Sequence, residues 1–289
     1  MEVIETYDEV KTNENINKDY IEIGVGLSLV DNIKPSEYFN EVVNNSKTYT
    51  ELENKVNQYY KDKKLTPKET SEKECDLVSI NIAKYLETNG FSLSPATLLS
   101  IHKTIFKNAF PQLLEKQVGV FRKVNISKLE DVLGGKKSVE YADFNDLKAT
   151  IDYDFSIEKE KKYNLMNKEE QVLNIAKFIS GIWQIHPFRE GNTRTIAVFT
   201  IKYLRNKGFN SNNDIFKTNS KYFRDALVLA NYESLQDKIY RDFSYLESFF
   251  NKFILNKKIE LKPLPKPKLN KSITIKQEQK STKNYGLSR

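Results

Sequence analysis

The sequence predicts a mainly α-helical protein with one small β-hairpin and a small helical segment at its N-terminus. Apolar residues recur at helical spacing through most of residues 66–255, whereas alternation of apolar and polar residues is confined to one stretch near residue 124. Hydrophobic residues make up 39% of the 289 residues and include 17 phenylalanines and 16 tyrosines. A chain of this length and composition is expected to bury a substantial core.

The N-terminal segment, residues 1–65, is expected to be a small helical appendage. Its first 18 residues are polar, Pro35 and Ser36 can begin a helix, and TYTELENKVNQYY repeats apolar residues at helical spacing. The charged stretch KDKKLTPKETSEKE, residues 61–74, indicates a linker. A main domain is therefore predicted over residues 66–255.

Start and stop signals delimit the helices of the main domain. Ser94 followed by Pro95 predicts one helix start. Asn167 with Glu170 forms a capping box before a run that is apolar around most of its circumference, so this helix is expected to be central. Pro187 ends that helix, and a second apolar helix follows.

The alternating stretch lies within GVFRKVNISKLEDVLGGKKSVEYADF, residues 119–144. Val124 and Ile126 flank a polar residue, Gly134 and Gly135 supply a turn, and SVEYA is extended in character. This pattern predicts an irregular β-hairpin within an otherwise helical chain.

The net charge of +7 is concentrated at the C-terminal end of the chain. Residues 251–289 contain eleven lysines and arginines and two glutamates, so the other residues together carry a charge of −2. Residues 256–289 are therefore predicted to be a flexible basic tail on a nearly neutral body. Nucleic acid is not the expected partner of such a chain, and a role of the tail in recruitment or export stays open.

Several classes of protein are excluded by composition. The single cysteine, Cys75, excludes an intrachain disulfide and a cysteine-based zinc site. The first residues, MEVIETYDEV, lack the pattern of a secretory signal, and no run of 18 apolar residues predicts a membrane span. A cytoplasmic location is expected, with export as an effector left open.

The loop HPFREGNTRT, residues 186–195, joins the two apolar helices and is rich in groups suited to phosphate chemistry. His186 leaves a buried helix, and an imidazole with an ordinary pKa of about 6.5 suits a general base. Phe188 would anchor the loop by burying its ring. Glu190 offers hard carboxylate oxygens of the kind that share Mg²⁺ with substrate phosphates.

The second half of the loop predicts an anion site. Gly191 permits close approach or positive φ, and the Asn192 amide can donate hydrogen bonds. The helix that follows has free N–H groups, and Arg194 in its first turn adds a fork of donors. Each residue alone is compatible with a polar turn between buried helices, but together they favour transfer from a nucleoside triphosphate to a hydroxyl.

HPFREGNTR resembles the signature of the Fic family (filamentation induced by cAMP), His-x-Phe-x-Asp/Glu-Gly-Asn-x-Arg, on a helix–loop–helix. GVFRKVNISK resembles the segment before the family's flap hairpin, and GIWQIHPF resembles the approach to its loop. YFRDALVLANY resembles the helix that helps to close the adenine pocket. The similarity extends from about residue 72 to 250 and implies a Fic-type helical bundle with a small β-hairpin flap.

The resemblance implies Mg²⁺-dependent transfer of AMP from ATP to a serine, threonine or tyrosine hydroxyl of a target protein. By that resemblance His186 deprotonates the hydroxyl and Glu190 holds Mg²⁺. The implied nucleotide-binding residues are Phe188, Gly191, Asn192, Thr193, Arg194, Tyr222 and Asn231. The implied flap residues, which would hold the target backbone by strand addition, are Ser138, Val139, Glu140 and Tyr141.

The sequence departs from the family pattern at Ala197, where many members carry a second arginine that orients the γ-phosphate. Thr193 differs from the Asn-Lys-Arg pattern of the phosphotransferase branch. This difference argues against that branch. Transfer of UMP or phosphate, or removal of AMP, is the alternative reaction on the same loop. A weakly active or inactive protein-binding module is the alternative from a different class.

The family's inhibitory motif, Ser/Thr-x-x-x-Glu-Gly/Asn, lies on a separate antitoxin or on an appended helix. The nearest counterpart in this chain is Asp31-Asn32 with Ser28, which has a shorter acid and a different spacing. Self-inhibition by the N-terminal segment and a partner antitoxin both stay open. The other histidine, His102, lies among apolar residues and is expected to pack within a helix rather than to act in catalysis.

Overall fold

The computed structural model describes residues 14–265, apart from residues 210, 212 and 256–258. This part of the chain forms twelve α-helices and three short 3-10 helices, which confirms the mainly helical class. The α-helices are α1 Lys18–Ser28, α2 Glu37–Asn44, α3 Tyr49–Tyr60, α4 Pro67–Glu87, α5 Pro95–Ile105, α6 Gln112–Glu115, α7 Leu147–Glu160, α8 Lys168–Ile185, α9 Asn192–Asn206, α10 Ile215–Thr218, α11 Ser220–Asn231 and α12 Ser244–Leu255. The 3-10 helices are η1 Leu29–Asp31, η2 Asp131–Leu133 and η3 Tyr163–Leu165.

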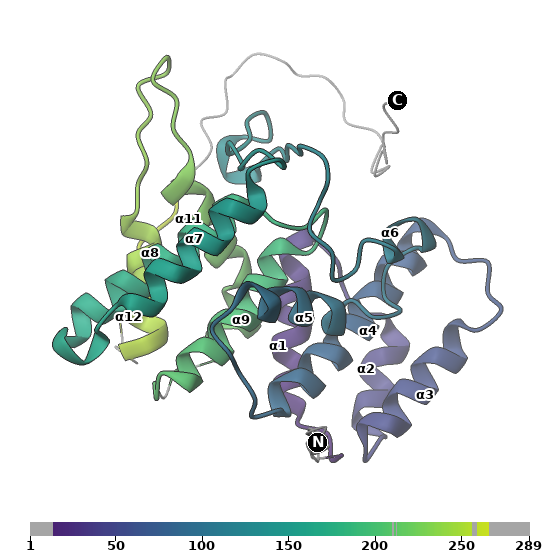
Figure 1. Ribbon diagram of the computed structural model, residues 1–289. Helices are drawn as coiled ribbons and strands as arrows, with labels where there is room; N and C mark the ends of the chain where they lie inside the picture. The colour runs from purple at the N-terminus through teal and green to yellow at the C-terminus, as the bar shows by residue number, and fades with distance from the viewer. Residues whose placement is uncertain (1–13, 210, 212, 256–258, 266–289) are drawn as a thin grey trace, which may run out of the picture.

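Helices α8 and α9 occupy the centre of the fold and are joined by the loop of residues 186–191. Helix α8 packs against α7, α11 and α12, while α9 packs against α5 and α4 (Figure 1). The predicted capping box begins α8, because the Asn167 side chain accepts from the N–H of Glu170 and the Glu170 carboxylate accepts from the N–H of Asn167. The predicted cap of α5 by Ser94 is also present.

The N-terminal segment packs into the body of the fold through α1. This helix lies along α4 and also contacts α9 (Figure 1). Gly24 and Gly26 permit the close approach, since an added Cβ would lie 2.6 Å from the Cα of Ser79 and 2.3 Å from the carbonyl oxygen of Phe216. One cluster of buried apolar side chains spans both sides of residue 65. The turn after α1 is thereby held beside the central loop.

Most of the predicted linker at residues 61–74 is instead helical. Helix α4 begins at Pro67, and Thr66 and Glu69 form a capping box in which each side chain accepts from the backbone N–H of the other. Proline at the first helical position and reciprocal capping outweigh the local excess of charge, which the exposed face of the helix accommodates. The expected linker is thus reduced to residues 61–66.

The predicted β-hairpin does not form a strand pair. Within the described residues the β-bridges are isolated ones, Asn15 with Thr48 and Ser234 with Ile239. The flap, residues 125–143, is closed by one backbone bond from Glu130 N–H to the Lys137 carbonyl oxygen and contains η2. Side chains and turns hold this segment where a ladder was expected, because the guanidinium of Arg122 takes backbone carbonyls that a partner strand would otherwise use.

The C-terminal region is described only in part. Residues 259–265 follow α12, with the N–H of Lys262 donating to Ser248 Oγ at 3.1 Å. The rest of the predicted tail, residues 256–258 and 266–289, lies outside the described residues. In the part of the chain that the structure describes, no helix combines the length and apolar character needed to cross a membrane.

Candidate active site

Two buried groups fix the start of the loop. His186 caps α8 in the left-handed region, with φ 52°. The guanidinium of Arg122 donates to the carbonyl oxygens of His186 at 2.8 Å and Ile185 at 3.2 Å. These bonds satisfy carbonyls that a helix C-terminus leaves unpaired. The His186 backbone is therefore held rigidly.

The side chain of His186 has the state that a general base requires. Its Nδ1 lies 3.2 Å from the Trp183 carbonyl oxygen, which assigns the proton to Nδ1 and leaves Nε2 as an acceptor. Burial lowers the pKa of His186 well below its ordinary value, and the nearby Lys128 acts in the same direction. The ring of Tyr141 stacks on the imidazole at 3.9 Å. The imidazole is thus neutral at neutral pH and is covered by the flap.

His102 supports the loop from the opposite side. Its Nδ1 accepts from the N–H of Gly119 at 2.8 Å, so its Nε2 carries the proton and donates to the carbonyl oxygen of Glu190 at 3.1 Å. Burial lowers its pKa to about 4, and its ring stacks on the fully buried Phe188 at 3.9 Å. Its packed position agrees with the sequence prediction, and the bond to the loop backbone is an additional finding.

The middle of the loop is shaped by side chains that face inward. Gly191 has φ 74°, and an added Cβ would lie 2.3 Å from the Phe106 ring. The Asn192 amide accepts from the N–H of Phe188 and donates to its carbonyl oxygen, both at 2.8 Å. Thr193 Oγ1 accepts from an indole N–H at 3.0 Å. The backbone N–H groups of residues 192–194 donate to no described residue, so the start of α9 can receive an anion.

Arg194 is buried at the edge of a cavity of about 320 Å³, the charged pocket, whose charged lining comprises Asp31, Lys128, Glu130, Asp131, Glu190, Arg194, Lys221, Arg224 and Asp225. Its Nη2 lies 2.8 Å from Glu74 Oε1 and 3.2 Å from Asp31 Oδ2. Its Nε and Nη1 have no hydrogen-bond partner among the described residues. Buried donors of this kind require an acceptor, and phosphate oxygens match the guanidinium fork.

Asp31 places a carboxylate in the charged pocket. It lies 2.9 Å from Lys128 Nζ and 3.1 Å from Arg224 Nη1, in addition to its contact with Arg194. Burial alone would raise the pKa of Asp31, but the three cations hold it far below its ordinary range. The neighbouring Asn32 lines the same pocket with a positive φ of 57°.

The buried ion pairs around Arg194 form a balanced set. Arg224 pairs with Glu130 through three contacts of 2.8 to 3.0 Å, and Arg194 pairs with Glu74. With Lys128, these two pairs hold one more cation than carboxylate, and Asp31 balances the remaining charge. The site therefore holds one negative group of the chain's own at a point suited to a phosphate.

Glu190 lines the same pocket with an exposed carboxylate. Among the described residues no cluster of three or more histidine, cysteine, aspartate or glutamate side chains could hold a metal ion. A single carboxylate fits Mg²⁺ only where substrate phosphates and water supply the other ligands, which is the usual coordination of Mg²⁺ at nucleotide sites.

Two of the residues expected to bind the nucleotide, Tyr222 and Asn231, do not line the charged pocket. The Tyr222 hydroxyl donates to the carbonyl oxygen of Lys262 at 2.9 Å, on the far side of α11. Asn231 is buried, donates to Ser180 Oγ at 2.9 Å, and lines a different cavity. Residues two apart on a helix point about 200° away from each other, so Arg224 and Tyr222 cannot both face the charged pocket.

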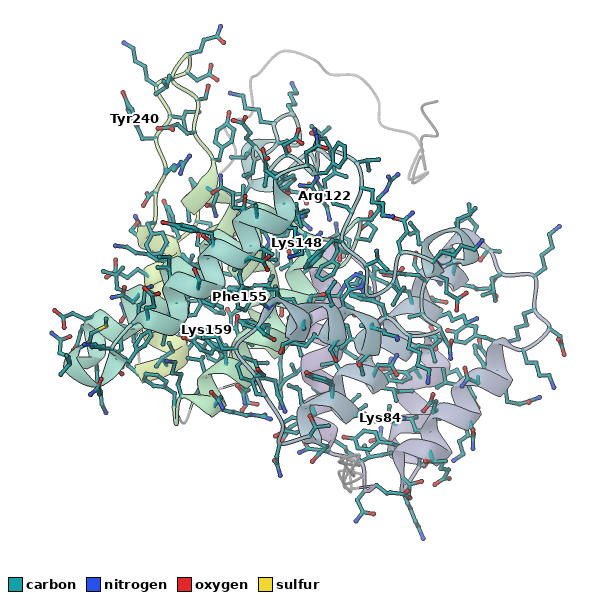
Figure 2. All side chains as sticks on the ribbon, viewed as in Figure 1. Lys84, Arg122, Lys148, Phe155, Lys159 and Tyr240 are labelled. Atoms are coloured by element: carbon teal, nitrogen blue, oxygen red, sulfur yellow. The ribbon has the colours of Figure 1, made fainter. Side chains whose placement is uncertain are left out.

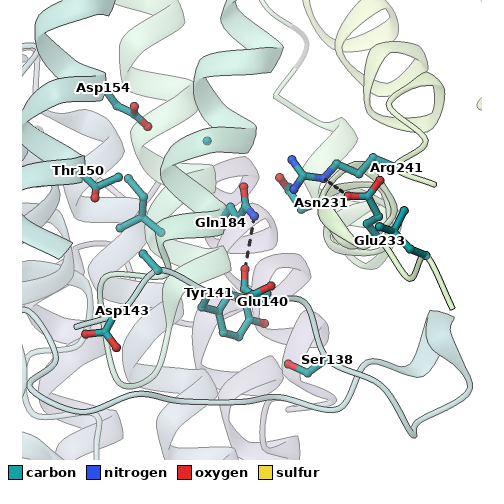
Figure 3. A pocket seen from close by; sticks show the side chains of 14 residues that line it. Ser138, Glu140, Tyr141, Asp143, Thr150, Asp154, Gln184, Asn231, Glu233 and Arg241 are labelled. Atoms are coloured by element: carbon teal, nitrogen blue, oxygen red, sulfur yellow. Dashed lines mark hydrogen bonds and ion pairs between the residues drawn. The ribbon is translucent and has the colours of Figure 1, made fainter. Parts of the chain in front are cut away.

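A cleft of about 860 Å³ is bordered by flap residues other than those that line the charged pocket (Figure 3). This acidic cleft is lined by Ser138, Glu140, Tyr141, Ala142, Asp143, Thr150, Asp154, Gly181, Gln184, Ile185, Asn231, Glu233, Leu235 and Arg241. Three of the four expected flap residues border it, whereas Val139 is buried. Gln184 Nε2 donates to the Glu140 carbonyl oxygen at 3.4 Å and ties the flap to α8.

Four charged residues at the site were missed by sequence reasoning, namely Glu74, Lys128, Glu130 and Arg224. Arg224 carried a usable signal, because it follows Phe223 on the buried side of an amphipathic helix, where an arginine needs a partner. Lys128 and Glu130 lie in an irregular loop, so no periodicity could have oriented them. Their role arises only from tertiary packing.

Comparison with known proteins identifies the domain. Residues 92–204 match the family model described as Fic/DOC family. The chain carries a Fic domain. The structure is also similar to the crystal structure of the N-terminal FIC domain of Bep8, a VirB-translocated Bartonella effector protein from Bartonella sp. 1-1C. The TM-score is 0.51 and the sequence identity 18%, over 67% of this chain and 88% of that chain. No curated protein matches significantly.

The likeness to the Bep8 domain extends to the fold alone at this identity. Fic domains are commonly transferases that attach nucleotides or other groups to proteins. The loop lies within the matched residues, whereas the charged pocket and the acidic cleft are also lined by residues outside them.

Proposed function

We propose that the chain transfers AMP from ATP to a serine, threonine or tyrosine hydroxyl of a target protein, with Mg²⁺ bound between the nucleotide and Glu190. The observation that carries the proposal is the placement of His186, with its unprotonated Nε2, at the start of the loop that leads to the unpaired guanidinium donors of Arg194. A base and a phosphate site on one loop suit nucleotidyl transfer.

In this reaction the target hydroxyl oxygen attacks the α-phosphorus while His186 Nε2 takes the hydroxyl proton. A new oxygen–phosphorus bond forms, the bond between the α-phosphorus and the bridging oxygen breaks, and pyrophosphate leaves. Donors at Arg194 and at the start of α9 would stabilise the charge that moves to the leaving group, so they should contribute more to kcat than to binding. Mg²⁺ would neutralise phosphate charge when it is bound.

Arg224 compensates for the missing second arginine of the loop. Ala197 is completely buried in the core, so this position of α9 supplies no second cation beside Arg194. Arg224, from α11, instead brings a second guanidinium to the Asp31 carboxylate that Arg194 also contacts. We infer that both arginines contact the nucleotide phosphates.

Asp31 is proposed to hold the site in an inhibited state. Its carboxylate takes up donors from Lys128, Arg194 and Arg224, which a triphosphate would also need. Because Asp31 follows α1, a packed helix of the same chain, self-inhibition is favoured over a separate antitoxin. Nucleotide binding would then require the turn at Asp31 and Asn32 to move aside.

The proposal is tested by incubating the purified chain with Mg²⁺, cell lysate and ATP labelled at either the α- or the γ-phosphate. We expect a protein band labelled from α-labelled ATP alone, and no label with His186→Ala. Label from γ-labelled ATP would indicate phosphoryl transfer, and stronger label from α-labelled UTP would indicate UMP transfer.

The absence of a second arginine at Ala197 favours one alternative of a different class, a protein-binding module without transferase activity. That reading predicts no label with any nucleotide and no calorimetric binding of Mg-ATP at millimolar concentration, even when Asp31 is replaced by asparagine.

A further inference from the structure

We propose that the acidic cleft docks an extended, basic segment of the target protein beside His186. The inference rests on the proposed function, since it names the class of target that this transferase would select.

The charge of the cleft is strongly one-sided. Its lining contains four carboxylates, Glu140, Asp143, Asp154 and Glu233, and one cation, Arg241, which lies 3.8 Å from Glu233 (Figure 3). Asp154 faces Gly181 and accepts no hydrogen bond from a described residue, and burial raises its pKa against a weaker attraction from Lys161. Lysine or arginine side chains of a ligand would supply the missing positive charge.

The flap offers backbone donors along the same cleft. The N–H groups of Glu140 and Tyr141, two residues that line the cleft, donate to no described residue. An extended peptide can bond to such groups by strand addition, which is insensitive to sequence, so the neighbouring side chains would set specificity. Tyr141 stacks on His186, and a segment that lies along the flap therefore runs past the proposed base.

The opposite wall of the cleft belongs to a loop that projects from the helices, residues 232–243. The bridge between Ser234 and Ile239 closes this loop, and Tyr240 is labelled on it in Figure 2. Leu235 lines the cleft and is 73% exposed, and Tyr240 is 67% exposed. An apolar residue next to the basic residues of the target segment would cover Leu235.

The inference is tested with two fluorescein-labelled peptides of twelve residues. One contains four lysines, one leucine and one threonine among alanines, and the other has glutamate in place of each lysine. Anisotropy titration with the full chain needs no nucleotide. We expect the lysine peptide to bind at least tenfold more tightly, and its affinity to fall as salt is raised.

Variants locate the binding. The triple variant Glu140→Gln, Asp154→Asn, Glu233→Gln should bind the lysine peptide about tenfold more weakly, since each exposed charge contributes two- to threefold. The matched control, Asp152→Asn, Glu160→Gln, Glu247→Gln, removes the same charge from exposed positions outside the cleft and should bind as the parent chain does.

Equal binding of the two peptides, no binding of either at millimolar concentration, or equal weakening by the two triple variants would overturn the inference. Because titration requires no transfer, failure of the labelling experiment with ATP leaves a positive docking result intact. If the chain labels proteins but binds the two peptides equally, the proposed function stands and the inference of a basic target segment is wrong.

Discussion

The charged pocket and the acidic cleft are lined by different parts of the flap, and their charged side chains differ in how closely they are paired. In the pocket, Arg194, Arg224 and Lys128 pair closely with Glu74, Glu130 and Asp31, and Asp31 completes the balance of this set of six. In the cleft, partly exposed carboxylates outnumber the cations. Unpaired charge in a buried site is strongly destabilising, whereas an exposed site can carry unpaired charge that a partner later neutralises. A phosphate can therefore enter the pocket only by replacing the Asp31 carboxylate, whereas a basic segment can enter the cleft without displacing a charged group.

Tyr141 connects the two regions. Its ring lines the acidic cleft and stacks on His186, and its hydroxyl donates to Glu130 Oε1 at 3.2 Å within the charged pocket. Glu130 in turn pairs with Arg224. A target that displaces Tyr141 would therefore uncover the proposed base and disturb a phosphate-site ion pair together.

The largest effect is expected for a substitution that leaves a buried carboxylate beside the charged pocket without its cation. Arg194→Ala leaves Glu74 buried without a cation, which should lower the free energy of unfolding by about 3–5 kcal/mol. Urea denaturation measures the change. Arg205→Ala, on the same helix but bonded to a carbonyl and a tyrosine hydroxyl, is the control and should lower it less. Equal losses in the two variants would show that the Glu74 pair is unimportant.

Crowding at the loop should give the next largest effect. Gly191 and Gly208 both have positive φ, of 74° and 79°, but only Gly191 has a ring within 4 Å of an added Cβ. Gly191→Ala should therefore destabilise by about 1–3 kcal/mol more than Gly208→Ala. Thermal melts of the two variants make the comparison. Matching melting temperatures would mean that the loop can move away from Phe106.

Removal of the pocket's own anion should raise nucleotide affinity. Asp31→Asn keeps the size of the side chain but leaves Lys128, Arg194 and Arg224 with excess positive charge, so Mg-ATP should bind about ten- to a hundredfold more tightly. Isothermal calorimetry measures the dissociation constant of Mg-ATP. Asp19→Asn, which removes a carboxylate from an exposed ion pair, serves as the control. Unchanged or weaker binding would contradict self-inhibition by Asp31.

The smallest effect concerns how the free energy of unfolding depends on pH. The contributions of Asp31 in the pocket and Asp154 in the cleft have opposite signs. The lowered pKa of Asp31 means that its contribution is present above pH 4 and is lost as the pH falls through its folded value. Burial raises the pKa of Asp154, so its contribution favours the fold at low pH and is lost as the pH rises. At pH 7, Asp31→Asn should destabilise, and Asp154→Asn should stabilise by a few tenths of a kcal/mol, roughly.

Melting temperatures of these two variants between pH 3 and 8 test the sign. A destabilising Asp154→Asn at pH 7 would show that the attraction of Lys161 outweighs the cost of burying this carboxylate, and the contrast between pocket and cleft would fail.

Local rules predicted the parts of the fold that are determined by neighbouring residues. The caps at Ser94 and Asn167 and the break at Pro187 were predicted correctly, since each depends on a few adjacent groups. The flap was predicted as strands because its side chains alternate. Strand formation depends on a partner, and here Arg122 takes carbonyl oxygens at Val124 and Ala142 while a 3-10 turn bends the flap.

The candidate site divides along the same line. The loop residues were predicted from their spacing, and the loop between α8 and α9 brings them together. Arg224 and Glu74 come from distant helices, and their convergence on the pocket follows from the packing of α4 and α11. Tyr222 was expected at the nucleotide because of the segment in which it lies, and the helical phase points its side chain away from the charged pocket.

The central claim is that His186 drives transfer of a nucleotide and that Asp31 restrains it. Mass spectrometry of lysate proteins, after incubation with Mg-ATP and either Asp31→Asn or the double variant Asp31→Asn, His186→Ala, tests both parts together. We predict AMP on serine, threonine or tyrosine hydroxyls with Asp31→Asn, less with the parent chain, and none with the double variant. The same adducts with and without His186, or no adduct from any chain, would contradict the account.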